Sequence, residues 1–493
     1  MPKRAGTLTL ALPPRDPTTP AYRWLCQALR AEILDGRLRP GARLPATRDL
    51  ARQYGLSRGT IVSAFEQLQS EGYVRGSVGS GTYVSRVLPD ELLHVARTGA
   101  AVPSARRNPR RHLSDFGKRV SPFPTYQPGR IRAFRPHQPA LDLFPTTLWT
   151  QITARRLRRA SSNLLLGCGP MGFPPLQEAV ADYLRTSRGV SCAPEQVAIV
   201  SGVQEALDLA ARLFVDAGDR VCMENPGYIG AALAFEACGA RVVPVPVDDE
   251  GMKVPGPSAR GVRLAYVTPA HQFPIGVGMS LARRLALLGW ARASEAVLFE
   301  DDYDSEYRYA GRPLPALQSL DRHGVVLFAG SFSKVLFPSL RLGYLVVPLD
   351  LTERVSAVRS IVSRHAPLLD QAVLCDFIAA GHFARHLRRM REVYAERLSV
   401  LMEAARELLA GLLDITGVEA GLQTAGWLHA GIDARAACAA AAARQVDVIP
   451  LSAYSRGRVA REGLLLGVAA VDAQEIRRGV RELASALEGL GRG

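Results

Sequence analysis

One lysine of this chain has the surroundings of a covalent nucleophile. Of the 61 lysine and arginine residues only four are lysines, and one of these, Lys334, lies in the polar stretch Gly330 to Arg341 between two apolar runs. An arginine keeps its proton in water, whereas a lysine amine can lose it and attack a carbonyl carbon. Lys334 is therefore a candidate for Schiff-base chemistry, although a lone lysine in a loop is more often simply solvated.

The neighbours of Lys334 suit a phosphate group. Ser331 and Ser333 supply hydroxyls, and Arg341 supplies a planar fork of N–H donors. Such a set of donors binds a phosphate monoester. Pyridoxal phosphate (PLP) carries a phosphate and an aldehyde on one ring, so it would use both the lysine and its polar neighbours.

A cluster of acids follows an upstream apolar segment. Residues 296–299 have the composition of a buried strand and run into Glu300-Asp-Asp-Tyr-Asp-Ser-Glu306. Open α/β sheets bind ligands at the carboxyl ends of their strands. A carboxylate there would keep a pyridine nitrogen protonated. The attraction between the two charges is at most about 4 kcal/mol at about 4 Å and an effective dielectric of about 20. A protonated ring acts as an electron sink. A calcium loop is the alternative, but this segment lacks the glycine and the longer series of acids that such a loop needs.

The two motifs together resemble those of MocR/GabR-type regulators, whose C-terminal part is similar to class I aminotransferases of PLP fold type I. The resemblance extends over most of the chain. It implies that Lys334 forms the internal aldimine with PLP and that Asp301 pairs with the pyridine nitrogen. Tyr303 would bind the ring oxygen O3′, and Ser331 and Arg341 would hold the phosphate.

Two strand-to-helix junctions and one loop add further coenzyme-binding candidates. Amide groups of residues 201–204, at the positive end of a helix, can bind the phosphate. By the family resemblance Tyr228 stacks on the pyridine ring, although a tyrosine after Pro-Gly is as often a packing residue. Where class I aminotransferases have Asn-Pro-x-Gly, residues 271–276 have Phe273 at the position of the asparagine. MocR-type proteins share the His-Gln form of this stretch, so the resemblance implies that His271 or Gln272 approaches O3′. The candidates are Gly202, Val203, Gln204, Tyr228 and His271.

The sequence also departs from the enzymes or from other relatives in three places. Class I aminotransferases clamp the substrate carboxylate with an arginine, but the corresponding strand, 463–468, has none. Some amino-acid-sensing relatives have an arginine at the position of Ala453, and Arg456 and Arg458 lie nearby without an assigned role. Cys168 replaces a tyrosine that in relatives often reaches the partner subunit's phosphate. Efficient transamination of an ordinary amino acid is therefore not expected.

Alternation of apolar strands and amphipathic helices in the C-terminal part predicts an α/β fold with a mostly parallel sheet and right-handed crossovers. From residue 368 the pattern is largely helical, which resembles the small C-terminal α/β lobe of fold type I. We therefore expect residues 131–493 to form an aminotransferase-like PLP-binding effector domain. The expected strands include 197–200, 221–224, 242–247 and 264–268, and the expected helices include 204–214, 229–237 and 281–292.

The first 85 residues predict a different module. A helix at 22–34 is followed by a short helix that ends at Gly55 and by a second helix from Arg58 to Glu71, which is a helix-turn-helix arrangement. Two extended pieces around Gly79-Ser-Gly81 predict a wing. Residues 15–85 thus resemble a GntR-family winged-helix DNA-binding domain, with a small solvated helical module as the alternative.

The GntR resemblance also implies which residues contact operator DNA. Two arginines would touch phosphates, three residues at the start of the second helix would face the major groove, and a wing-tip glycine would approach the DNA backbone. In that order, these residues are Arg43, Arg48, Ser57, Arg58, Thr60 and Gly81.

The charge distribution agrees with a polyanionic partner for the N-terminal part. The net charge is +15, and residues 1–120 hold 20 lysines and arginines against nine acidic residues. Such a basic block suggests nucleic acid. Residues 86–130 are rich in Pro, Ser and Arg with few periodic apolar positions, so we expect a basic linker, whose arginines at 106–111 either add phosphate contacts or are merely solvated.

Other classes of protein are disfavoured by composition. Seven scattered cysteines without a Cys-x-x-Cys pair predict neither a disulfide framework nor a zinc site, and no metal site is expected. No apolar run approaches membrane-spanning length. The N-terminus does not have the pattern of a signal peptide, so we expect a cytoplasmic protein.

These observations lead to one main hypothesis. We expect a homodimeric, PLP-dependent transcriptional regulator that binds operator DNA and senses an amine, an amino acid or the B6 vitamer itself through an aldimine site. The first alternative is an active class I-type aminotransferase that carries a DNA-binding module. The second, a GntR-type regulator that has lost PLP, conflicts with the presence of Lys334, Asp301 and Tyr303 together.

Overall fold

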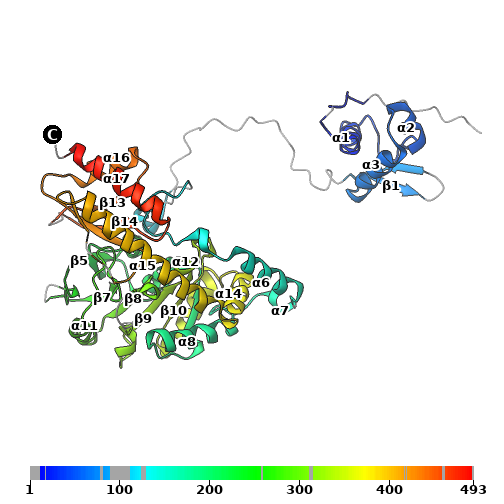
Figure 1. Ribbon diagram of the computed structural model, residues 1–493. Coiled ribbons are helices and arrows are strands. Elements are labelled where there is room, and N and C mark those ends of the chain that lie inside the picture. The colour runs from blue at the N-terminus through cyan, green and yellow to red at the C-terminus, as the bar shows by residue number, and fades with distance from the viewer. Residues whose placement is uncertain are drawn as a thin grey trace, which may run out of the picture. The chain divides into compact units, whose positions relative to one another are not determined.

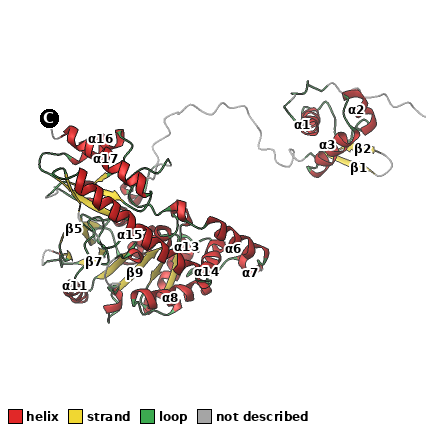
Figure 2. Cartoon of the chain, in the orientation of Figure 1, coloured by secondary structure: helices red, strands yellow, loops and turns green. Residues whose placement is uncertain are grey.

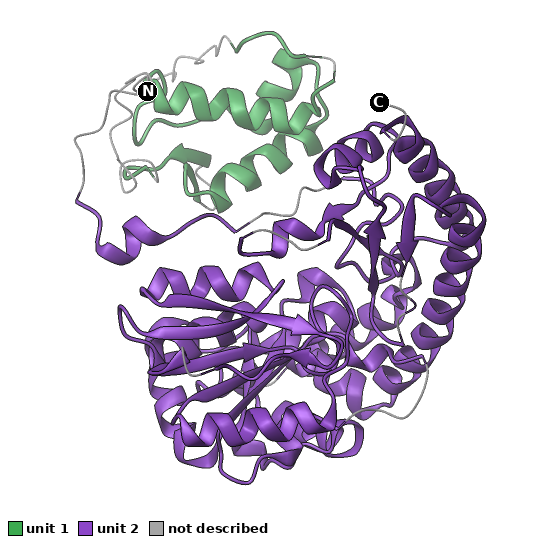
Figure 3. Ribbon diagram, turned by 90° about the vertical axis from the view of Figure 1, so that its left-hand side faces the viewer, with its two compact units in different colours: residues 1–111 green, residues 112–493 purple. Residues whose placement is uncertain are grey.

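The structure, a computed structural model, divides into two compact units, residues 1–111 and residues 112–493 (Figure 3). Most of the range predicted as a linker, 86–130, lies outside the described residues, but residues 112–123 belong to the second unit. No helix among the described residues is long and apolar enough to cross a membrane. The described residues are 12–16, 18–77, 81–88, 112–123, 129–160, 162–256, 259–309, 315–415, 417, 419–457 and 461–490.

The described residues of the N-terminal unit form three helices and a two-stranded antiparallel ribbon (Figure 1). Helix α2 ends because Gly55 takes a left-handed backbone conformation with φ of 64°, which glycine adopts at little cost. Ser57 then caps α3, since its Oγ accepts the backbone N–H of Thr60 at 3.1 Å. The elements are α1 (Ala21–Leu34), α2 (Thr47–Tyr54), α3 (Arg58–Ser70), β1 (Val74–Ser77) and β2 (Gly81–Val84).

One apolar stripe from each helix forms the core of this unit. Leu25 and Leu29 of α1, Leu50 of α2, and Ile61 and Leu68 of α3 are fully buried and belong to one cluster. Within α1 and α3 these residues are spaced by four and seven positions, which places them on one helical face. The predicted helix-turn-helix with a wing is therefore present.

A mixed, mostly parallel sheet of eight strands forms the centre of the second unit, as predicted (Figure 2). Neighbouring strands are parallel except that β10 is antiparallel to β3 and β9, and β6 is antiparallel to β5. In spatial order the strands are β3 (Val197–Val200), β10 (Gly343–Val346), β9 (Val326–Ser331), β8 (Val297–Asp302), β7 (Val262–Val267), β4 (Arg220–Asn225), β5 (Arg241–Asp248) and β6 (Gly251–Met252).

Helices cover both faces of this sheet because successive strand residues point to opposite sides. In β3, Ala198 and Val200 pack with one set of helices, whereas Val197 and Ile199 pack with another. Helices on the first face are α9 (Val203–Phe214), α10 (Ile229–Cys238) and α13 (Thr352–Val362). Helices on the second face are α8 (Pro174–Arg188), α11 (Leu281–Ala293) and α14 (Leu368–Ala379). Helices α5 (Asp115–Arg119), α6 (Thr146–Arg158) and α7 (Ser162–Leu166) precede them in the chain.

A smaller C-terminal lobe has its own four-stranded sheet and core. The long helix α15 leads into it and packs along α17, as Figure 1 shows. Buried Leu464 and Leu466 of the sheet contact buried Ile476 and Val480 of α17. The elements of this lobe are α15 (His382–Leu408), β11 (Leu413–Ile415), β12 (Gln423–Leu428), α16 (Ala434–Ala443), β13 (Ile449–Pro450), β14 (Gly463–Gly467) and α17 (Ala473–Leu490).

An entry segment, residues 129–140, joins the two lobes. Ala133 and Phe134 are fully buried in the core of the small lobe, and Phe134 pairs with Gly467 in an isolated antiparallel bridge. A β-carbon on Gly467 would overlap the carbonyl oxygen of Arg135, so a glycine is required there.

We expect Gly467→Ala to lower the free energy of unfolding by about 1–3 kcal/mol, because backbone atoms must shift to admit the methyl group. Gly489→Ala is the control, since a β-carbon there meets no atom within 4 Å. Removing a helical glycine should instead raise stability by at most about 1 kcal/mol. Urea denaturation followed by circular dichroism measures both changes, and equal effects of the two substitutions would contradict the packing argument.

Candidate coenzyme site and DNA interface

The predicted coenzyme-binding residues meet at one edge of the large sheet. Parallel strands end at the same edge, so the segments that follow β4, β7, β8 and β9 lie together there. Strand β3 runs in the same direction as β9, because both are antiparallel to β10. The segments after β3, β4, β7, β8 and β9 begin at Ser201, Pro226, Thr268, Tyr303 and Phe332 respectively.

Lys334 lies in α12 (Phe332–Val335), a single helical turn directly after β9. Its Nζ donates a hydrogen bond to the carbonyl oxygen of His137 at 3.2 Å. Burial lowers the pKa of the amine to about 8, while Asp304 and Asp301 oppose the shift and Arg341 adds to it. A lower pKa leaves more neutral amine near neutral pH, which is the form that attacks a carbonyl.

Asp301, near the end of β8, has one carboxylate oxygen in use and one available. Tyr266 of β7 donates its hydroxyl to Oδ2 at 2.7 Å. The other oxygen, Oδ1, is buried and has no hydrogen-bond partner within the described part of the chain. Burial raises the pKa of this carboxyl to about 7. A buried oxygen without a donor is costly, and a pyridinium N–H would satisfy it. The residues present therefore fit the pyridine end of PLP.

Tyr303 and His271 form a polar pair beside Asp301. His271 Nδ1 lies 3.0 Å from the Tyr303 hydroxyl and 2.9 Å from Oδ1 of Asp304. Asp304 is fixed in turn, because its Oδ2 accepts the backbone N–H of Leu422 at 3.1 Å. His271 Nε2 is buried and, among the residues that the structure describes, has no partner. The pair thus leaves one imidazole nitrogen free for a ring oxygen.

Gln272, the alternative to His271, is committed to the loop itself. Its amide nitrogen donates to Glu224 at 3.1 Å and to the carbonyl oxygen of Pro226 at 2.9 Å. Glu224 also accepts the backbone N–H of Thr268 at 3.0 Å, and its burial raises its pKa to about 7. These contacts fix the 268–273 loop against the end of β4, so His271 is the better candidate for the coenzyme.

The predicted phosphate end is a cradle built around Gly202. This glycine precedes α9 with φ of 105°, a conformation that favours glycine. A β-carbon on Gly202 would lie 3.5 Å from the guanidinium carbon of Arg341, so the absence of a side chain lets the two residues approach. The amide of Val203 begins the helix, where an anion is favoured. Ser331 ends β9 beside them, which brings four of the predicted phosphate ligands to the same sheet edge.

Two predicted phosphate ligands have other partners. The Ser333 hydroxyl lies 3.5 Å from the carbonyl oxygen of Leu342, at the limit of a hydrogen bond. The Gln204 side chain donates to the carbonyl oxygen of Gly230 at 2.9 Å. Only the backbone amide of Gln204 is then available for a phosphate, as the sequence predicted.

An aromatic cluster includes the ring of His137, whose carbonyl oxygen contacts Lys334. Tyr228 lies with its ring centroid 5.8 Å from that of Phe273, and Phe273 lies 5.0 Å from Tyr454. His137 completes the group, with its ring 5.4 Å from Phe273 and its Nε2 3.1 Å from the Tyr454 hydroxyl. Burial lowers the pKa of His137 to about 3, so its imidazole is neutral at physiological pH.

The arginines considered for a carboxylate clamp do not fill that role within the described residues. The guanidinium of Arg456 pairs with Glu236 at 2.7 Å, on the surface. Arg458 lies outside the described residues. The β14 strand presents only fully buried leucines, Leu464 to Leu466, and Leu465 packs against Phe273.

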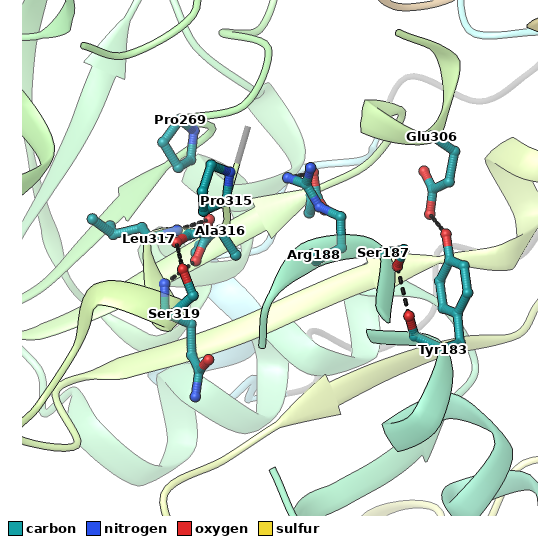
Figure 4. A network of polar contacts seen from close by, with 12 residues as sticks. Tyr183, Ser187, Arg188, Pro269, Glu306, Pro315, Ala316, Leu317 and Ser319 are labelled. Carbon is teal, nitrogen blue, oxygen red and sulfur yellow. Dashed lines mark hydrogen bonds and ion pairs between the residues drawn. The ribbon is translucent and has the colours of Figure 1, made fainter. Parts of the chain in front are cut away.

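A buried polar layer holds β8 from its opposite side. Since alternate residues face opposite sides, Asp302 points away from Asp301 and receives two hydrogen bonds from Arg188, at 2.7 and 3.2 Å. Figure 4 shows Arg188 beside Tyr183, whose hydroxyl donates to Glu306 at 3.0 Å. Glu300 accepts the backbone N–H groups of Leu317 and Gln318 at 2.7 and 2.8 Å, and Leu317 is also seen in Figure 4.

The sequence reasoning missed four residues of this site. Tyr266 lies inside a strand and has the appearance of an ordinary strand aromatic. The sequence indicates Asp304 only as one member of the acid cluster, and no motif distinguishes Thr268 from the residues beside it. His137 contributes a backbone carbonyl oxygen, which every residue has, so the residue type does not predict this role.

The predicted DNA-contacting residues lie on the wing, α2 and the start of α3. Arg43 forms a bridge with Tyr83 of β2, and its guanidinium lies beside Gly81, where a β-carbon would come within 2.9 Å of it. Arg48 is exposed on α2, with its Nε 3.8 Å from Asp49. At the start of α3, Arg58 is exposed, whereas the Ser57 and Thr60 hydroxyls lie 2.9 Å apart. The role of these residues in DNA binding stays a prediction.

We expect Arg188→Met to lower the free energy of unfolding by about 3–5 kcal/mol, because Asp302 is left buried without its partner. Arg185→Met on the same helix is the control, since its ion pair with Asp182 is largely exposed and should contribute less than about 1 kcal/mol. Chemical denaturation of the purified protein compares the two. Similar losses for both variants would show that the Arg188 pair is not what supports β8.

Asp301→Asn should change how stability depends on pH in the coenzyme-free protein. The folded carboxyl has a pKa of about 7, above the unfolded value near 4, so the unfolded chain releases the proton first as pH rises. Wild-type stability therefore falls between about pH 4 and 7 by at most about 1.4 kcal/mol per pH unit from this group. The variant should lack that part of the slope, as measured by urea denaturation across this range.

Asp182→Asn, which removes a largely exposed carboxylate, is the matched control and should keep the wild-type slope. An unchanged slope in Asp301→Asn would mean that the carboxyl is ionised in the folded protein at low pH.

Comparisons with known proteins agree with both modules. A family model of bacterial regulatory proteins of the gntR family matches residues 21–84, and a model of class I and II aminotransferases matches residues 144–483. The kynurenine aminotransferase of Pyrococcus horikoshii, solved in complex with PMP, has a similar structure: the TM-score is 0.67 at 28% identity, over 72% of this chain and 90% of that one. The predicted fold class, a winged helix joined to a PLP fold type I domain, is thereby confirmed, and the fold implies PLP as the coenzyme.

Full-length relatives combine the same two modules. The chain is 42% identical over 477 residues to the probable rhizopine catabolism regulatory protein MocR of Rhizobium meliloti, covering 96% of this chain and 94% of the relative. It is 30% identical over 485 residues to the pyridoxine biosynthesis transcriptional regulator PdxR of Corynebacterium glutamicum, covering 97% and 98%. The chain therefore belongs to the MocR-type transcriptional regulators, which join a GntR-type DNA-binding domain to an aminotransferase class I and II domain.

Proposed function

We propose that this protein is a PLP-dependent regulator that binds operator DNA and responds to an amine, an amino acid or the B6 vitamer. The single observation that carries the proposal is the pairing, at one sheet edge, of a lysine with a lowered pKa and a buried carboxylate whose Oδ1 has no partner in the described structure. The GntR-type module supplies the DNA-binding part. We place its activity in the cytoplasm, where its DNA would be.

Each group of this site would bind a different part of the coenzyme. PLP supplies an aldehyde for a neutral lysine amine and a ring that withdraws electrons. Asp301 Oδ1 would accept the pyridine N–H, and Tyr303 with His271 would bind the ring oxygen. Arg341 and Ser331, with the amides of residues 202–204, would bind the phosphate, and Tyr228 would cover one ring face.

Two observations favour a sensor over a working aminotransferase. The strand that faces the site from the small lobe, β14, presents buried leucines in place of a cation that could clamp a carboxylate. Arg456, which is close in sequence, is paired with Glu236. The aminotransferase alternative predicts steady turnover with an amino donor and a keto acid, whereas the sensor predicts a half-reaction or none.

A homodimer is part of the proposal. Large apolar side chains are exposed together on α7 and the end of α13, including Leu165 at 76%, Leu166 at 83% and Ile361 at 87% exposure. Isolated monomers rarely expose such clusters. Cys168 lines a groove that contains Leu166 and His365, next to this surface. A twofold partner would also pair two DNA-binding modules, as palindromic operators require.

An effector can regulate such a dimer only if it binds two conformational states with different affinities. The coenzyme site would supply that difference through Lys334, and the linker would transmit it to the DNA-binding module. The sense of regulation follows from which state binds operator DNA more tightly.

We expect Lys334→Ala to abolish covalent binding of PLP while the protein stays folded. Lys253→Ala, which removes a largely exposed lysine, should keep it. Visible absorbance of the purified proteins and mass spectrometry after borohydride reduction measure the bound coenzyme. Identical spectra for Lys334→Ala and the wild type would refute the proposal.

Sequencing of DNA retained by the protein, with and without PLP and candidate amines, should give a recurrent pair of half-sites.

A further inference from the structure

Two described segments at the start of the second unit, 112–123 and 129–140, contact two residues of the candidate coenzyme site. The carbonyl oxygen of His137 accepts the Lys334 amine at 3.2 Å. The ring of Phe123 meets the ring of Tyr228 edge to face, with centroids 6.3 Å apart and an interplanar angle of 63°. Phe123 lies inside the range predicted as a linker, 86–130, and His137 lies seven residues beyond its end.

The Phe123 contact is anchored to the helix that follows Tyr228. Helix α5 packs on α10, which begins at the residue after Tyr228. Arg119 at the end of α5 donates its Nε–H to the carbonyl oxygen of Ala237 at 3.2 Å. Ser114 caps α5 by accepting the backbone N–H of Gly117 at 3.1 Å. A movement of Tyr228 or α10 would therefore reach α5 directly.

The His137 contact depends on an unusual backbone conformation. His137 has φ of 66°, which residues other than glycine adopt only at a cost and only when the surroundings impose it. Its N–H donates to the side chain of Gln423 at 3.2 Å, and its imidazole is held by Tyr454 and Phe273. These contacts direct its carbonyl to Lys334, and because the imidazole is neutral, His137 exerts no charge on the amine.

Capture of the lysine by an aldehyde would remove the donor from this contact. Condensation forms a C=N bond and breaks the C=O bond, and water leaves with the carbonyl oxygen and both protons of the neutral amine. The His137 carbonyl then loses the N–H that it accepts, which removes one of the contacts that offset the cost of its backbone conformation. At the same time, a ring placed against Tyr228 would restrict the residue that Phe123 contacts.

We propose that Phe123 and His137 belong to the coenzyme site and report its occupancy to the segment that leads toward the DNA-binding module. His137 responds to covalent capture of Lys334, and Phe123 responds to occupancy of the face of Tyr228. The inference rests on the proposed function, because it requires PLP to bind at Lys334. It goes beyond that function by assigning positioning roles to two residues outside the motifs that define the site.

Hydrogen–deuterium exchange of the full-length protein with and without PLP tests this inference. We expect exchange over residues 129–140 to rise at least about threefold when PLP is covalently bound, because His137 is released. Exchange over residues 112–123 should fall at least about twofold as Tyr228 is fixed. Lys334→Met should show no rise over 129–140, since it cannot capture the aldehyde.

A second variant pair isolates the Phe123 contact. Phe123→Ala should keep covalently bound PLP and the response at 129–140 but lose the response at 112–123. Phe116→Ala is the matched control, because Phe116 is similarly exposed and lies on α5 itself. It should respond as the wild type does.

The outcomes separate this inference from the proposed function. Absence of covalently bound PLP in the wild type would overturn both. Bound PLP with unchanged exchange in both segments would overturn the inference alone and leave the two contacts as simple packing. A wild-type response over 112–123 in Phe123→Ala would remove Phe123 from the assignment.

Discussion

The structure of the site depends on the removal of water from a small group of charges at the end of the large sheet. Burial disfavours the charged form of each group, so it lowers the pKa of the lysine at 334 and raises that of the carboxyl at 301. The two pKa values then lie close together, about 8 and about 7. Both pKa values therefore lie near neutral pH, so each group can gain or lose a proton easily. This suits the capture of an aldehyde by the amine and the binding of a pyridine ring by the carboxyl group.

The geometry of a β-strand separates these reactive groups from the charges that only support them. Residue 301 faces Tyr266 on one side of the sheet, while residues 300 and 302 face backbone amides and Arg188 on the other side. The supporting carboxylates are satisfied by partners fixed in the fold, whereas Asp301 Oδ1 is left without one in the described structure. A single run of acids thus divides into carboxylates with fixed partners and one carboxylate with an unpartnered oxygen, without any change of residue type.

The fold class was predictable because it depends on local patterns. Alternation of apolar strands and amphipathic helices identifies a parallel sheet, and residues at or just after the carboxyl end of a parallel strand lie at one edge of it. The position of Asp301 near the end of β8 and that of Lys334 just after β9 could be predicted in this way, whereas their roles in coenzyme binding stay predictions. Tyr266 lies within a strand, so its role depends on which strand is its neighbour in the sheet, and the sequence does not state that order.

Two other features were unpredictable for a different reason. His137 contributes a main-chain oxygen, and its unusual φ results from contacts with residues several hundred positions away. Helix α5 has no buried residue and therefore no apolar period to detect. The sequence predicts a linker there because the position of the helix is set by a few contacts with α10, and only the tertiary structure shows these contacts.

The one reversed strand in the middle of the sheet has a consequence for the dimensions of the site. A parallel successor to β9 would have to begin at the far edge, after a long crossover. Because β10 runs backward, the chain leaves β9 at residue 331 and enters β10 at residue 343 on the same side, and the amide of Phe332 closes this loop on the carbonyl oxygen of Leu342 at 3.1 Å. The groups that would grip opposite ends of the coenzyme, Lys334 and Arg341, therefore share one short loop. The span between them is set by covalent connectivity and would survive flexing of the sheet or relative motion of the two lobes.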